Sequence, residues 1–71
     1  MILQLNPLLE AFEAARRAAA DAIHSNDEVT VDDRGDHWVF EFIPRGEGLG
    51  GGALVSISKD RFRVLKLVRA Q

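Results

Sequence analysis

The hydrophobic pattern of the chain changes its period once, and this change constrains the fold more than any other feature. In the first third, apolar residues recur every three to four positions, which places them on one face of an α-helix. The pattern predicts a helix over residues 7–24. It should begin after Asn6, because Asn caps free amides and Pro7 loses no hydrogen bond at the first helical position. The apolar stripe consists of Leu8, Phe12, Ala15, Ala19, Ala22 and Ile23.

Beyond Asp27, apolar residues alternate with polar ones at the period of two that is typical of half-buried β-strands. Segments rich in Asp, Gly and Lys separate these stretches and predict turns. We expect strands at residues 28–32, 37–43, 53–58 and 62–69. A helix followed by four strands predicts a single α+β domain over residues 1–71, in which one helix packs on a four-stranded antiparallel β-meander.

The aromatic strand at residues 37–43 supplies the expected core, because Trp38, Phe40 and Phe42 share one of its faces. The last predicted strand carries apolar residues on both faces, and a single helix covers only one side of a sheet. Small proteins also expose scattered aliphatic residues, so an ordinary surface and an interface with a protein partner are both open. The predicted interface on the uncovered face consists of Val39, Glu41, Ile43, Leu54, Leu67 and Val68.

Composition excludes several classes of function. A chain of 71 residues forms one small domain. With a net charge of −2 it has no basic field to hold a nucleic acid. The absence of cysteine excludes disulfides, a Cys-type zinc site and a thiol nucleophile, and it is compatible with the cytoplasm, where we expect the protein to be located. No run approaches the ~20 apolar residues that span a bilayer, so no membrane partner is expected.

A glycine-rich segment at residues 46–51 contains the pattern G-x-G-x-x-G. In nucleotide-binding proteins a helix begins directly after these glycines, so that its N-terminus faces the phosphate. Here the predicted strand at 53–58 follows instead. The pattern therefore predicts a loose hairpin loop, and no cofactor is expected.

Other polar residues allow an enzymatic alternative. His37 with Asp33 or Asp36 could contribute to a metal site, although Asp residues in such a segment also form ordinary turns. Ser56 and Ser58 alternate with apolar residues and are expected to be solvated strand residues rather than nucleophiles.

The spacing of charged residues predicts two ion pairs, and the helical period predicts the position of a second histidine. Glu13 and Arg17 stand four residues apart on the predicted helix. Glu41 and Lys66 would pair across the sheet if the second and fourth strands come close. His24 falls on the polar face near the C-terminus of the helix, where a positive charge is favoured.

The C-terminal half carries a pattern that resembles a known group of domains. It consists of Trp38-x-Phe40, a glycine-rich loop, Gly51-Gly52-Ala53-x-Val55-x-Ile57-x-Lys59-Asp60, and Val64-Leu65-Lys66-Leu67 near Gln71. This pattern is similar to small cystatin-like α+β domains, above all to the nuclear-transport-factor-fold immunity proteins of bacterial polymorphic toxin systems, and to PepSY domains. The resemblance implies a helix-then-meander fold and an immunity-like role. The Q-x-V-x-G loop of cystatin inhibitors is absent, so protease inhibition is not implied.

Together these observations predict a small non-enzymatic protein-binding module that acts through the uncovered sheet face, as an immunity-like or inhibitor protein. One alternative is a structural homodimer. Another is a small metal-dependent enzyme that uses His37 with Asp33 or Asp36. Because the chain starts at Met1 and has capped ends, we also expect a complete domain.

Overall fold

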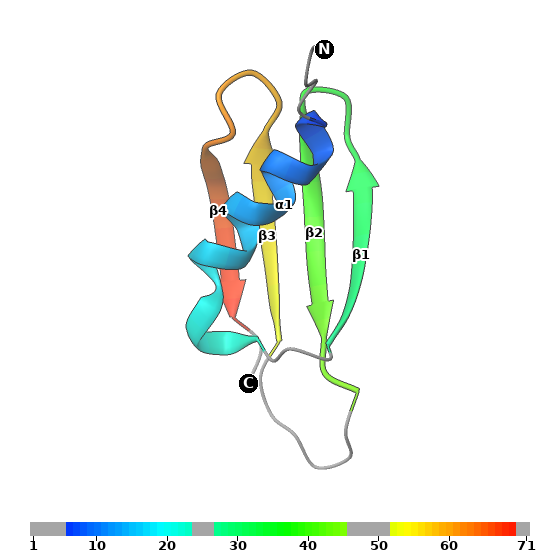
Figure 1. The fold of residues 1–71 in the computed structure, drawn as a ribbon, viewed down its shortest axis with the longest axis vertical. Coiled ribbons are helices and arrows are strands. Elements are labelled where there is room, and N and C mark those ends of the chain that lie inside the picture. Colours follow the sequence, from blue (N-terminus) through cyan, green and yellow to red (C-terminus); the bar gives the residue numbers. More distant parts are fainter. Residues whose placement is uncertain (1–5, 24–26, 46–51, 70–71) are drawn as a thin grey trace, which may run out of the picture.

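The computed structural model describes residues 6–23, 27–45 and 52–69. It confirms the expected α+β fold with one helix and an antiparallel sheet of strand order β1-β2-β3-β4 (Figure 1). Each strand pairs with the next one in the sequence. The elements are α1 (Pro7–Ala18), the 3₁₀-helix η1 (Ala20–Ala22), β1 (Glu28–Asp33), β2 (His37–Ile43), β3 (Ala53–Ser58) and β4 (Val64–Arg69).

The helix begins as predicted but ends earlier. The side chain of Asn6 accepts a hydrogen bond of 3.0 Å from the backbone N–H of Leu8, which caps the first turn. At Ala19 the backbone leaves the α-helical conformation, and the N–H of Ala22 bonds to the carbonyl of Ala19 at 2.8 Å. This tighter turn directs the chain back toward the sheet, where the carbonyl of Ala22 accepts a bond of 2.9 Å from Gly52. The prediction of one continuous helix over 7–24 was therefore wrong in its last turns.

The strands match the sequence closely except at the start of β4. Predicted strands 37–43 and 53–58 coincide with β2 and β3, and β1 is one residue longer than expected. The fourth strand begins at Val64 rather than Phe62, because Phe62 has a φ of 54° and belongs to the turn. The N–H of Phe62 bonds to the carbonyl of Ser58 at 3.1 Å, and the hydroxyl of Ser58 accepts from the N–H of Arg63 at 2.9 Å.

The core lies between α1 and the middle of the sheet. Alanine has a small side chain, so the helix axis approaches β3 closely. The ring of Phe12 lies 6.1 Å from the rings of both Phe40 and Phe42, which fills the space beside the alanines. Trp38 packs at the margin of this cluster. The buried apolar residues are Ala11, Ala15, Ala19, Phe40, Phe42, Ala53, Val55 and Ile57.

The helix covers only part of one sheet face. It packs on β2, β3 and β4 (Figure 1). A helix with its side chains is about 10 Å across and strands are about 4.8 Å apart, so one helix covers about three strands. Val29 and Val31 of β1 pair with the core residues Phe42 and Phe40, yet they remain 39% and 47% exposed.

We expect Gly52→Ala to lower the free energy of unfolding by about 2 kcal/mol, measured by urea denaturation. Gly52 has a φ of 100°, and an added Cβ would lie 2.8 Å from the carbonyl oxygen of Phe42. The matched control is Gly35→Ala, because Gly35 has a φ of 95° but no atom within 4 Å of an added Cβ. The control should lose about 1 kcal/mol from backbone strain alone. Equal losses in the two variants would contradict the close approach at Gly52.

Candidate protein-binding surface

The sheet face opposite α1, which we name the far face, collects most of the residues predicted to bind a partner. Glu41 pairs with Leu54, and Leu54 pairs with Val68, so these three side chains form one row across the sheet. Val39 lies in the neighbouring row opposite Ser56. Ile43 follows Glu41 two positions along β2 and shares its face. Five of the six predicted residues therefore share one surface.

Leu67 is the exception, because it lies on the helix side of the sheet. It pairs with the buried Val55 and packs against the core. The register of β4 shifts between its pairs with Ser56 and Ile57, so Ser56 faces Lys66 while Ile57 faces Val64. The extra residue of this bulge exchanges the faces along β4, which is why both faces of the strand look apolar in the sequence.

The far face combines a small apolar centre with charged margins. Val39, Ile43 and Leu54 are half-buried. A shallow hollow of about 170 Å³ is lined by residues that include Ile43, Leu54 and Val68. Ser56 and Ser58 were predicted to be solvated, and this was wrong, because each is only 7% exposed. An apolar centre with a polar margin is the usual composition of a protein interface.

The ion pairs predicted from spacing differ from those in the structure. Strand β3 separates Glu41 from Lys66, and no ion pair joins them among the contacts of the described residues. On the helix, Glu13 pairs with Arg16 at 2.7 Å rather than with Arg17. Arg16 lowers the pKa of Glu13 through this hydrogen bond and its charge.

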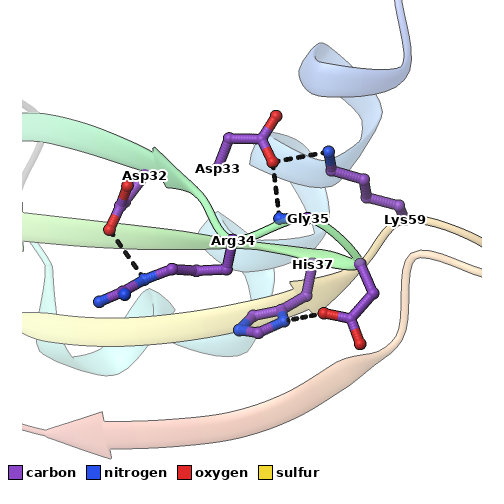
Figure 2. Close-up of polar contacts among 7 residues, drawn as sticks. Asp32, Asp33, Arg34, Gly35, His37 and Lys59 are labelled. Atoms are coloured by element: carbon purple, nitrogen blue, oxygen red, sulfur yellow. Dashed lines mark hydrogen bonds and ion pairs between the residues drawn. The ribbon is translucent and has the colours of Figure 1, made fainter.

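A cluster of polar residues joins the turn between β1 and β2 to the turn between β3 and β4. Figure 2 shows Asp33 pointing toward Lys59, whose Nζ lies 2.7 Å from Asp33 Oδ1. The same ammonium lies 5.2 Å from the ring centroid of Trp38. His37 lies apart from Asp33, and its Nδ1 is 2.6 Å from Asp36 Oδ1. The backbone N–H of Lys59 also bonds to the carbonyl of Asp36 at 3.1 Å.

These contacts connect the two hairpins, and we name the cluster of Asp33, Asp36, His37 and Lys59 the clip. Asp33, proposed as a metal ligand beside His37, already accepts hydrogen bonds from Lys59 and from the N–H of Gly35. Across residues 6–23, 27–45 and 52–69, no three His, Cys, Asp or Glu side chains are grouped so that they could hold a metal ion. His24 and the glycine segment 46–51 lie outside the described residues.

Two carboxyl groups of the clip have shifted pKa values. The hydrogen bond from Lys59 holds the pKa of Asp33 below its usual value, and the N–H of Gly35 adds to this effect. The hydrogen bond with His37 lowers the pKa of Asp36. A carboxyl whose pKa is lowered by folding stabilises the folded state above its unfolded pKa, and the stabilisation disappears as the pH falls through the folded value. Both groups are exposed, so solvent screens these interactions.

A second concave surface, which the sequence reasoning missed, lies between α1 and β1 on the helix side. Two neighbouring hollows of about 470 and 260 Å³ share Phe12 and Val29 in their lining, and we name them together the groove. Arg16 and Arg17 contribute to one end, and Leu8 to the other. The sequence did carry one signal for this groove. A single helix is narrower than a sheet of four strands, so it leaves part of the helix side exposed.

Comparisons of the chain with protein-family models, curated proteins and solved structures found no match. In the part of the chain that the structure describes, no helix is long and apolar enough to cross a membrane.

We expect Lys59→Met to raise the pKa of Asp33 toward its usual value, because the variant keeps the length of the side chain but removes the ammonium. The measurement is an NMR titration of the side-chain carboxyl groups. The variant should also lose less stability than the parent when the pH is lowered from about 3.8 into the range below it. Glu13 is the internal control, since its partner is Arg16. An unchanged Asp33 titration would show that Lys59 does not hold this carboxylate in solution.

Proposed function

We propose that the protein is a small non-enzymatic protein-binding module and that its binding surface is the far face. The observation that carries this proposal is the row Glu41, Leu54 and Val68, which runs across three strands beside the half-buried Val39 and Ile43. Antiparallel strands hold these side chains at fixed spacing, so little conformational entropy is lost when a partner covers them. The shallow shape suits a protein surface better than a small molecule, whose sites are usually enclosed.

Within this class, an immunity-like inhibitor of a toxin is the narrower proposal. It is supported by the resemblance of the C-terminal half to immunity proteins and by the α+β fold that such a resemblance implies. In this case the partner is a toxin encoded next to the gene for this chain. Co-expression of that neighbouring product, followed by co-purification, is the direct test.

A homodimer through the same face is the second candidate. Leu54 and Val68 would then contact the same residues of a second copy about a two-fold axis. A dimer of this kind forms with the purified chain alone, whereas an inhibitor is a monomer until its target is added.

We expect a photo-crosslinking residue at position 68, in cells that naturally express the protein, to give one protein adduct of defined mass. Position 64 is the matched control, because Val64 and Val68 are both 45% exposed and both lie on β4. Adding Glu41→Lys to the chain with the probe at 68 should weaken the adduct, since it reverses a charge in the same row. An adduct of twice the chain mass that Glu41→Lys weakens identifies the homodimer through the far face. Equal labelling from both positions, or none from position 68, would refute the far face as the binding surface.

A further inference from the structure

The two edge strands of the sheet carry charges of opposite sign. Strand β1 has the sequence EVTVDD, with three acidic residues and no basic one. Strand β4 has the sequence VLKLVR, with two basic residues and no acidic one. The two strands lie at opposite ends of the strand order (Figure 1).

The β1 edge is regular, and no other strand among the described residues pairs with its outer side. All six residues of β1 are exposed, and their pairing with β2 continues without a bulge. The groove between β1 and α1 leaves Val29 and Val31 accessible from the helix side. An edge strand also presents backbone N–H and C=O groups that no neighbouring strand satisfies, and these are the groups to which a further strand binds.

Charge determines which strand fits this edge. Pairing β1 with β1 of a second copy would oppose acidic residues, for example Glu28 to Asp32 when Thr30 lies on the two-fold axis. Pairing β4 with β4 about a two-fold axis at Lys66 would oppose this residue to itself. Like charges directly opposite each other destabilise a sheet, whereas opposite charges stabilise it. Among the four strands of this chain, only β4 therefore complements β1.

We infer that copies of this chain associate head to tail, with β4 of one copy docked antiparallel on β1 of the next. An antiparallel register with all helices on one face places Lys66 opposite Asp32 of the neighbouring copy. In the same register, Leu67 lies opposite Val31 on the helix side, and Val68 lies opposite Thr30 on the far face. Asp32 already pairs with Arg34 at 2.8 Å, but both side chains are exposed and a carboxylate accepts several hydrogen bonds.

In this arrangement the neighbouring copy covers part of the groove. Helix α1 packs partly over β4 of its own copy. Docking β4 beside the next β1 therefore brings the end of one copy's helix layer next to the exposed Val29 and Val31 of the other. Because the two surfaces differ, each copy keeps one free edge, and the assembly extends beyond a dimer.

The test is sedimentation velocity of the full chain over a range of concentrations, at low and high salt. We expect species larger than a dimer at high concentration, and weaker association at high salt because the paired charges are exposed. Asp32→Lys and Lys66→Glu should each weaken association about tenfold, since each replaces an attraction by a repulsion. Chemical denaturation of each variant shows whether it remains folded.

Mixing the two variants supplies the decisive measurement. The Lys66 edge of the Asp32→Lys chain fits the Asp32 edge of the Lys66→Glu chain, so the mixture should recover association that neither variant shows alone. Glu41→Lys is the control for the far face and should leave this association unchanged. A chain that stays monomeric at millimolar concentration would overturn the inference, as would a dimer that does not grow or a mixture without recovery.

Discussion

The close packing of an alanine-faced helix on the central strands is the constraint on which the rest of this structure depends. Ala11, Ala15 and Ala19 have no exposed surface, and together they let α1 approach the sheet at Val55 and Ile57. Phe12 fills the remaining space beside Phe40 and Phe42. Such a small domain has one core layer, and its described residues hold no second α-helix to cover what α1 leaves open.

The uncovered surfaces follow from this geometry. No helix among the described residues covers the far face, so its aliphatic side chains are shielded there by their neighbours in the sheet. On the helix side, β1 lies beyond the width of α1, which leaves the groove beside Val29 and Val31. Lys59 stabilises the other end of the sheet, where it contacts Asp33 and Trp38 from the opposite hairpin. The polar residues that suggested a metal site thus hold the two hairpins together.

Local sequence signals were sufficient for most of the fold, and they failed where tertiary context decides. Asn6 and Pro7 marked the helix start, and strict alternation marked β2 and β3. The alanine run did not reveal the helix end, because Ala favours helix at every position. The left-handed conformation of Phe62 and the bulge in β4 have no short-range signature, so the side of Leu67 could not be assigned. Alternation alone correctly placed five of the six residues that were predicted to lie on the far face, whereas the groove required knowing where the helix lies across the sheet.

The far face and the contact between β4 and β1 of successive copies can be used at the same time, because the rows of far-face residues cross the sheet from one edge to the other. Each far-face row is perpendicular to the strands, and one of them joins Asp32, Val39, Ser56 and Lys66 from one edge to the other. When Lys66 lies opposite Asp32 of the next copy, this row continues across the junction without a step. The far faces of successive copies then form one surface with a repeated pattern. A partner with several binding sites would bind such an array more tightly than a single copy, because each contact raises the effective concentration of the next. Edge pairing would in this way strengthen binding at the far face without occupying it.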